Sequence, residues 1–295
     1  MKQYKGIYNH YKENMVISEK ITKDFLHLCF SVSNFLKRGL KSQSILVFPE
    51  YPSRNSTLYK LGNLLGYTIT NKPSKRNSAL VYWENKTHRT EQNKLDQLQK
   101  KYIINKGSVN ISKVFVDATH LSVFGYNTMV NPTSHTGKMV QKSDTNAKHD
   151  GQLIEGPIDT PLSGSIYQIL VDNTVNQDLI VDMRVPYIGE VTDFIYLKYR
   201  PIQERFENTT IKTELKKTDE HLSNTEIKQI EDFCKKSNLD FGELDVLRDN
   251  TSGKIYIVDV NNTPFGPPAN IEKQDGKKAL KRIAYYFEKN FINKN

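Results

Sequence analysis

The chain has 295 residues, of which 37% are hydrophobic and 10% aromatic, and this composition excludes a wholly disordered protein. Its 42 basic and 33 acidic residues give a net charge of +9, which favours an anionic partner. The basic residues are not interleaved with aromatic ones as in a nucleic-acid-binding surface, so we expect no nucleic-acid partner.

The sequence gives no indication of a membrane or secreted protein. No apolar run approaches the ~20 residues of a membrane-spanning helix, and the first residues lack the apolar stretch of a secretion signal. We therefore expect a cytoplasmic protein without membrane insertion. The two cysteines, Cys29 and Cys234, are far apart, which argues against a disulfide framework, and we expect both to be buried apolar side chains.

The first hundred residues predict a small α/β layer. A helix is expected over residues 22–40, where Gly39 is a natural stop. Short strands over 44–50, 67–70 and 78–83 accompany a second helix over 55–67, and a polar helix over 89–102 would close the unit. Strands and helices in this order are typical of an α/β arrangement.

After this layer the pattern changes to one of strands. Residues 137–143 alternate apolar and polar side chains, and residues 143–151 have the composition of a mobile loop. Strand candidates at 165–173, 178–189 and 193–201 favour an antiparallel sheet. Amphipathic helices are expected over about 224–236 and over 276–292.

Residues 241–264, FGELDVLRDNTSGKIYIVDVNNTP, contain two predicted strands joined by a turn. Side chains two apart on a strand face the same side, so Glu243 and Asp245 share one face, as do Asp259 and Asn261. The hairpin would gather Asp245, Asp259 and Asn261, whose carboxylates repel each other unless a cation lies between them. Such hard oxygen donors suit Mg²⁺, and the alternative is an ordinary hairpin with acids facing solvent.

The stretch GELDVLRDNTSGKIYIVDVNNTP resembles the C-terminal signature of ATP-grasp enzymes, in which acids on two neighbouring strands are followed by asparagine and proline. The resemblance implies an α/β (α+β) ATP-grasp fold with an N-terminal α/β domain over 1–104. Two α+β subdomains, 105–172 and 173–295, would then grip ATP. It also implies Mg²⁺ ligation by Asp245, Asp259 and Asn261, where the family usually has glutamate in place of Asp259.

The resemblance extends upstream to Asn105 and implies a nucleotide site. NKGSVNISK and GKMVQKS are similar to the segments whose lysines bind ATP phosphates, and IYQILVD is similar to the strand that meets adenine. The loop after GKMVQKS is glycine-rich in the family, whereas this chain offers only Gly151 and the charges of two neighbouring side chains. The implied nucleotide-binding residues are Lys113, Lys142, Lys148, His149, Gln168, Ile169 and Leu170.

LIVDMRVPYIG and YLKYRP resemble the family's next two strands and imply Arg184, Lys198 and Arg200 as catalytic residues. Each candidate has an ordinary alternative: Lys142 as a solvent-facing lysine, the arginines as structural ion pairs, and His149 as a solvated loop histidine. His120 and His135 have no convincing partners, and we expect both at the surface.

The resemblance implies an ATP-dependent ligase that uses Mg²⁺ and ATP to activate a carboxylate as an acyl phosphate for attack by an amine or another nucleophile. The chain also resembles ATP-grasp-like proteins of bacterial surface-polysaccharide synthesis, so a sugar or an amino acid is the expected small-molecule acceptor. Two alternatives stay open at this point: an ATP-grasp-like kinase, and a non-catalytic nucleotide- or polyanion-binding module.

Overall fold

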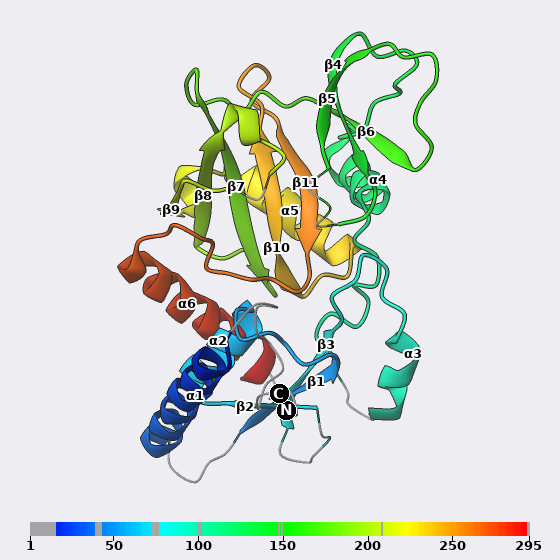
Figure 1. Ribbon diagram of the computed structural model, residues 1–295. Helices are drawn as coiled ribbons and strands as arrows, with labels where there is room; N and C mark the ends of the chain where they lie inside the picture. The colour runs from blue at the N-terminus through cyan, green and yellow to red at the C-terminus, as the bar shows by residue number, and fades with distance from the viewer. Residues whose placement is uncertain are drawn as a thin grey trace.

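The computed structural model describes residues 16–38, 43–71, 73, 77–98, 102–146, 148, 150–207 and 209–293. Within these ranges the chain forms three β-sheets with helices packed beside them (Figure 1). The predicted mixed α/β fold class is therefore confirmed. None of the helices in these ranges combines the length and apolarity that crossing a bilayer requires.

The first sheet is parallel, with strand order β2-β1-β3. Its elements are α1 (Ile17–Arg38), β1 (Ser44–Pro49), α2 (Thr57–Leu65), β2 (Thr68–Thr70) and β3 (Asn77–Trp83). Helix α2 begins after Ser56, whose side chain accepts a hydrogen bond from the Tyr59 amide, and ends at Gly66, where φ is +72°. The three strands and the first two helices predicted for this layer are confirmed, and α1 begins earlier than expected. The predicted stop at Gly39 lies outside the described residues.

The polar helix predicted over residues 89–102 is wrong for the part of it that the structure describes. Only a short helix α3 (Gln92–Leu95) and a 3₁₀ turn (Asp96–Leu98) form there. Arg89 is buried, and its guanidinium donates hydrogen bonds to the carbonyls of Glu84, Tyr82 and Asn262. These bonds, one of which reaches across 173 residues to Asn262, fix the buried start of the segment outside the helix, and a polar helical pattern does not reveal them.

The second sheet is small and antiparallel, with strand order β5-β4-β6. Its strands are β4 (Gly137–Ser143), β5 (Gln152–Gly156) and β6 (Ser165–Ile169), and helix α4 (Lys113–Phe124) precedes them. The strand predicted over 165–173 therefore belongs to this sheet, not to one sheet with residues 178–201. Figure 1 shows this sheet and α4 on one side of the larger central sheet.

The central sheet is antiparallel, with strand order β11-β10-β7-β8-β9. Its strands are β7 (Leu179–Ile188), β8 (Phe194–Pro201), β9 (Lys212–Lys217), β10 (Phe241–Arg248) and β11 (Ile255–Asn261). Helix α5 (Asn224–Lys236) covers one face (Figure 1) and starts with a capping box between Ser223 and Glu226. The predicted hairpin over residues 241–264 is confirmed as β10 and β11.

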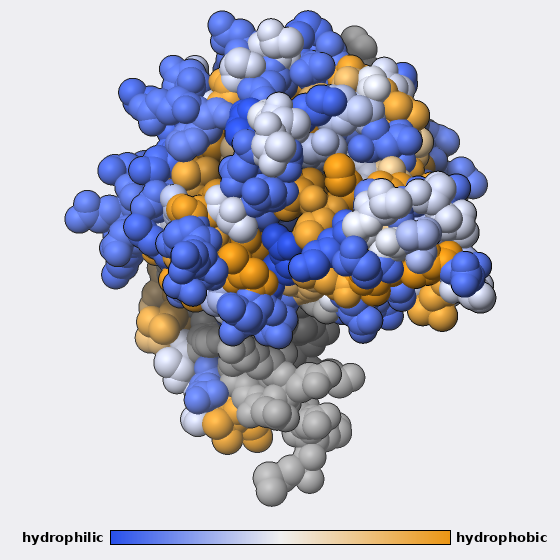
Figure 2. All heavy atoms as spheres, turned by 90° about the horizontal axis from the view of Figure 1, so that it is seen from above, coloured by the Kyte–Doolittle hydropathy of each residue, from blue (hydrophilic) through white to orange (hydrophobic). Residues whose placement is uncertain are grey.

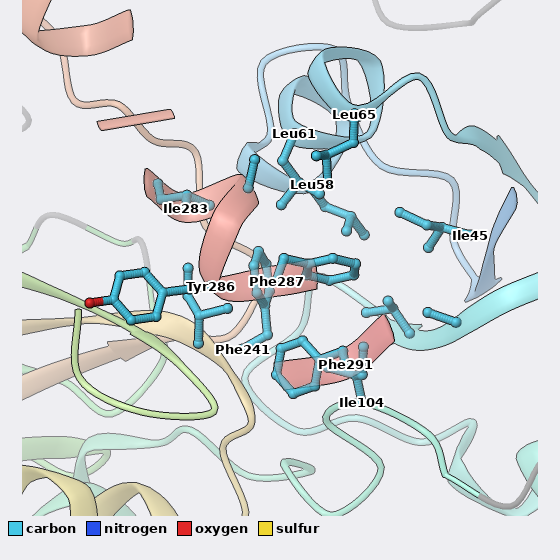
Figure 3. Packing of buried hydrophobic residues seen from close by; sticks show 14 of the residues in the cluster. Ile45, Leu58, Leu61, Leu65, Ile104, Phe241, Ile283, Tyr286, Phe287 and Phe291 are labelled. Carbon is cyan, nitrogen blue, oxygen red and sulfur yellow. The ribbon is translucent and has the colours of Figure 1, made fainter. Parts of the chain in front are cut away.

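Two hydrophobic clusters hold these parts together. Beneath the central sheet, Val185, Leu197 and Leu244 pack with Ile230 and Phe233 of α5. The other large cluster joins the first sheet and α2 to α6 (Lys273–Phe287) and the π-helical turn Glu288–Ile292 that follows it. In Figure 3, Phe287 of α6 lies between the leucines of α2 and Phe241 of β10.

The cysteine and histidine predictions were correct in part. Cys234 is buried as expected, but Cys29 is exposed, because it lies on a solvent-facing side of α1. His120 was expected at the surface and is fully buried, stacked on Phe124 at 4.2 Å between ring centroids. Burial lowers the pKa of His120 to about 4, so the ring is neutral. His135 is partly exposed.

Figure 2 looks onto the end of the molecule near β4 and β5. Hydrophilic residues surround the rim of this face, and hydrophobic residues show between them towards the middle.

Candidate functional site

The central sheet brings several predicted residues onto one face. Asp245 of β10 lies opposite Asp259 of β11 and opposite Arg184 of β7. Lys198 of β8 lies opposite Asp182, two residues before Arg184. Directly opposed residues of neighbouring strands point to the same side of a sheet, and the other side is occupied by the core under α5. The charged side chains therefore share the face away from α5.

Arg184 and Asp245 form the tightest ion pair on this face. The Nε and Nη2 atoms of Arg184 donate to the two Asp245 carboxylate oxygens at 2.8 and 2.9 Å, and Lys198 Nζ lies 3.6 Å from Oδ1. Burial raises the pKa of Asp245, but the charges of Arg184 and Lys198 outweigh it and hold that pKa well below its ordinary range. Asp245 is therefore an ionised carboxylate.

Arg200 lies on the same face but is engaged elsewhere. Its Nη2 atom is 2.8 Å from Asp182 Oδ2, and Nη1 donates to the carbonyls of Arg205 and Glu207. Asp182 in turn accepts a hydrogen bond from Asn173. This network ties β7 and β8 to the loop after β8, which favours the structural alternative for Arg200.

Asp259 lies directly opposite Asp245, and Asn261, two residues further along β11, lies opposite Glu243. The Oδ1 atom of Asp259 is buried and finds no hydrogen-bond partner among the described residues. Burial raises the pKa of Asp259; Asp245 acts in the same direction, while Lys113 and Lys142 oppose them. The Oδ1 atom of Asn261 accepts a hydrogen bond from the Thr263 amide at 3.0 Å. In the described ranges no three acids, histidines or cysteines are placed so that they could hold a metal ion together, so a metal here would rely on two carboxylates and one amide.

Lys113 is the first residue of α4 and reaches towards this acidic pair from the side of the small sheet. Its Nζ atom donates to the Thr145 carbonyl at 3.1 Å and to Asn146 Oδ1 at 3.2 Å. Asn146 also donates from its side chain to the Val260 carbonyl, and its amide donates to Thr87 Oγ1. The loop after β4 thus rests on α4, on β11 and on the N-terminal layer.

Lys142 on β4 belongs to the same electrostatic cluster. Burial lowers its pKa to about 8; Asp259 and Asp245 oppose this fall, and Lys113 adds to it. Lys148 is exposed in the loop beyond, and the predicted residue His149 lies outside the described residues. The structure therefore brings Lys113 and Lys142 to the two aspartates but does not bring Lys148.

The predicted adenine-contacting segment forms β6 and the residue after it. Gln168 is buried, and its Nε2 atom donates to Thr128 Oγ1 at 3.3 Å. The Ile169 amide donates to the Thr128 carbonyl, and Leu170 follows the end of the strand. Thr128 was not predicted, because its contact with β6 crosses 40 residues of sequence.

Glu243 is the acid that the sequence interpretation left without a role. It is 2% exposed, neither of its carboxylate oxygens has a hydrogen-bond partner in the described part of the chain, and Arg184 Nη1 lies 3.7 Å away. Burial raises the pKa of Glu243. Because Glu243 is two residues before Asp245 on the same strand, the sequence could have placed it on this face. Nothing in the sequence indicated that Glu243 is buried.

The loop after β11 closes over Glu243 and is fixed by the N-terminal layer. The Thr57 amide donates to the Pro264 carbonyl at 2.8 Å, and Lys60 Nζ donates to the Gly266 carbonyl at 2.9 Å. A Cβ atom added at Gly266 would lie 2.5 Å from Glu243 Oε1, so the backbone approaches this carboxylate closely. The layer thereby determines where the chain goes directly after Asn261.

A separate pocket of about 420 Å³ lies near the junction of residues 102–107 with α5. Its lining includes Lys106, Cys234 and Asp240 and none of the predicted site residues. The candidate site is thus the charged face of the central sheet and not this pocket.

Comparison with known proteins gives no match among family models or curated sequences. Among solved structures, the chain is similar to the ATP-grasp ligase PsnB complexed with minimal precursor, Mg and ADP. That similarity has a TM-score of 0.53 and 12% identity and covers 83% of this chain and 97% of the other. PsnB complexed with precursor peptide PsnA2 and AMPPNP gives a TM-score of 0.51 at 13% identity, with the same coverage of both chains.

A D-alanine–D-alanine ligase from Bacillus anthracis is similar with a TM-score of 0.50 and 10% identity, over 85% of this chain and 97% of that one. At such low identity the likeness concerns the arrangement of the backbone. Over these 83–85% of its residues the chain shares the backbone arrangement of these proteins, and it has the ATP-grasp fold.

Proposed function

We propose that this protein is an ATP-dependent ligase that activates a carboxylate with Mg²⁺-ATP for attack by an amine or another nucleophile. One observation carries the proposal: Asp245 and Asp259 lie opposite each other on the central sheet, and Lys113 of α4 and Lys142 of the small sheet are near enough for their charges to oppose the rise in the pKa of Asp259. If the hairpin only carried acids that face solvent, there would be no reason for two lysines from other elements to lie near those acids. Acids beside lysines between two sheets suit a metal-bound polyphosphate.

Asp245, Asp259 and Asn261 would hold Mg²⁺. The fit rests on the buried Asp259 Oδ1, which lacks a partner among the described residues, and on the ionised state of Asp245. Each Asp245 oxygen that accepts from Arg184 keeps lone pairs for a further contact. Carboxylate and amide oxygens in small number suit this hard cation, which would neutralise charge on the phosphates during transfer.

Lys113 and Lys142 would bind the phosphates of ATP, and β6 with Leu170 would border the adenine. The bonds from Lys113 to Thr145 and Asn146 hold the loop after β4 against α4, where a loop that covers phosphates is expected. Lys148 and His149 belong to the same loop in sequence and would add positive charge. Closing this loop would exclude water from an activated substrate.

Arg184 is the residue of this chain that we assign to charge stabilisation during ligation. Its guanidinium is fixed by Asp245 and lies on the site face, beside Lys198. A cation held in place in this way stabilises negative charge that develops on an acyl phosphate or a tetrahedral intermediate. Arg200 is better explained as a structural residue, since Asp182 and two backbone carbonyls occupy it.

We infer an amino acid or a peptide as the first acceptor class to test. One similar protein was studied with a precursor peptide, and the other is named for D-alanine. A sugar precursor is tested in parallel. The N-terminal layer would take part in the choice of acceptor, because Thr57 and Lys60 fix the loop beside Glu243.

The experiment that tests the nucleotide site is a thermal-shift titration with ATP, ADP and a non-hydrolysable ATP analogue, each with and without Mg²⁺. A ligand that binds only the folded state raises the melting temperature by an amount that grows with ligand concentration. We expect a rise of several degrees at saturating Mg²⁺-ATP and a smaller one without the metal. No shift at millimolar nucleotide would contradict the proposal.

Release of ADP then separates the possible reactions. A ligase releases ADP and phosphate in a manner that depends on both a carboxylate and a nucleophile, whereas a kinase leaves a stable phosphorylated product. Nucleotide binding without turnover for any acceptor in the panel would instead support a binding module.

The lowered pKa of Lys142 predicts how the affinity for ATP changes with pH. Because its pKa is lowered to about 8, the side chain loses its positive charge as the pH rises through that value. We expect the dissociation constant for ATP to be constant near pH 7 and to increase above about pH 8 by roughly 10-fold or more. Lys142→Arg should remove this increase, since arginine stays charged. Lys148→Arg is the control and should leave the pH profile as in the wild type; an unchanged profile in Lys142→Arg would contradict the assignment.

A further inference from the structure

Helix α1 exposes a row of large apolar side chains that the proposed site does not use. Their exposed fractions lie between 47% and 74%. The residues are Ile17, Ile21, Phe25, Leu28, Val32 and Leu36, and we refer to them as the α1 stripe. Leu26 is exposed as well but does not follow this spacing.

The spacing places the α1 stripe on one side of the helix. Its members follow each other at steps of three or four residues, and at 3.6 residues per turn they occupy roughly 100° of the circumference. Polar residues Glu19 and Thr22 take exposed positions outside this sector, and Ser18 lies at its edge. A continuous apolar sector of this kind is typical of a helix face that packs against another helix.

The described residues leave the α1 stripe largely exposed. Helix α1 is attached through Asp24, which is 4% exposed and forms an ion pair with Arg54 just before α2. In Figure 1, α1 lies beside α2 at the end of the molecule farthest from the small sheet. Asp24 lies one turn before Leu28, so the helix is attached along one border of the α1 stripe. The stripe residues beside this border stay about half exposed or more.

We propose that the α1 stripe binds the α1 stripe of a second copy of this chain and forms a two-fold symmetric homodimer. Burying about half of six such side chains removes on the order of 400 Å² of apolar surface from water. A standard interface buries ~800 Å² per partner, of which ~57% is apolar, so the apolar area of the α1 stripe is close to the roughly 450 Å² of apolar area that one partner contributes. A two-fold axis lets one apolar surface be its own complement, so no second patch is needed.

The dimer would not depend on the nucleotide site. The α1 stripe lies on the N-terminal layer, and none of the residues assigned to metal, phosphate or adenine belongs to α1. Failure of the ligase proposal would leave this inference standing, and the reverse also holds.

Sedimentation of the full-length protein across nanomolar to high-micromolar concentrations tests the proposal. The wild type is expected to pass from monomer to dimer within this range. Leu28→Asp should weaken the dimer by about 100-fold or more, because the substitution enters a symmetric interface twice and places a charge at each position. Leu26→Asp is the matched control, since it changes the same residue type at a 61% exposed position outside the α1 stripe. It should keep the wild-type affinity, and both variants should have the wild-type melting temperature at a protein concentration at which the wild type is monomeric.

Cys29 gives a second readout that does not require a change in affinity. It is exposed near the middle of α1 and next to Leu28, whereas Cys234 is buried. A short bismaleimide should therefore join two copies through Cys29 in the wild type and in Leu26→Asp, but not in Leu28→Asp. Cys29→Ser should give no cross-linked species.

The proposal is overturned if the wild type stays monomeric throughout, if Leu28→Asp and Leu26→Asp sediment alike, or if a dimeric wild type does not cross-link through Cys29. Co-sedimentation with vesicles of anionic and neutral phospholipid is run alongside. Vesicle binding by a monomeric wild type that is lost in Leu28→Asp would assign the α1 stripe to a lipid surface and reject the dimer.

Discussion

Asp259→Asn is expected to lower turnover by about 10³-fold or more while leaving the melting temperature unchanged or higher. The substitution removes one charged oxygen from the proposed metal site. It also removes a partly buried carboxylate whose Oδ1 atom has no partner among the described residues. Burying an unpaired charge is destabilising, so the neutral amide should not weaken the fold. Activity and stability are therefore expected to move independently at this position.

The measurement combines turnover with melting curves recorded with and without Mg²⁺-ATP. Wild-type protein should gain stability from Mg²⁺-ATP, and Asp259→Asn should gain little. Asp159→Asn, at an exposed acid between β5 and β6, is the control and should behave like the wild type in both assays. Wild-type turnover in Asp259→Asn would show that the metal site has been assigned to the wrong residue.

Asn105→Ala is expected to reduce the free energy of unfolding by about 3–5 kcal/mol. Asn105 is fully buried, and its Oδ1 atom accepts from the amides of Asp240 and Phe241 at 2.8 and 2.9 Å. Its Nδ2 atom donates to the carbonyls of Phe241 and Asn262. Alanine would leave these buried groups unpaired, and it would also have to adopt the φ of +62° that Asn105 has.

Urea unfolding of Asn105→Ala and Asn105→Gly separates the two causes. Both variants lose the same hydrogen bonds, but glycine tolerates the positive φ, so it should be more stable than alanine by about 1 kcal/mol. Asn131→Ala is the control at an exposed position, where the side chain only accepts bonds from Thr133. A loss below about 1 kcal/mol in Asn105→Ala would contradict this account.

The parts of the fold that could be predicted are those with a strong local pattern. Helix α5 has a capping box and an apolar face, and it was predicted with the observed bounds of 224–236. The β10–β11 hairpin alternates clearly about a turn of glycine, serine and asparagine. Because the side-chain period of a strand is two, the same alternation placed Asp245 and Asp259 on one face before any contact was known.

The strands that were not predicted, β5 and β9, are both edge strands. Residues 212–217, KTELKK, carry charges on an outer strand of the central sheet, and residues 152–156 lie largely exposed at the edge of the small sheet. Edge strands avoid apolar alternation because it would promote pairing with other chains. Helix α4 was missed because it is apolar on several sides. Its apolar residues are spread around the helix and produce no clear amphipathic face.

The site could be predicted only where its residues follow one another in sequence. The acids of the hairpin are close together along the chain, whereas the bonds of Asn146 to Val260 and Thr87 cross 114 and 59 residues. The burial of Glu243 depends on Gly266 and on the N-terminal layer that holds its loop. Such contacts are set by how the elements pack together, and no local pattern contains that information.

The cluster that joins α2 to α6 has a consequence for synthesis of the chain. Leu58 and Leu61 of α2 share their core with Ile283 and Phe287, which lie more than two hundred residues later in the sequence. A ribosome that adds ~5–20 residues per second needs roughly 10–40 s to supply α6 after β3 has been made. During that interval the apolar side of α2 lacks α6, its final partner. A chaperone that protects exposed apolar segments would therefore bind the first layer until α6 has been made.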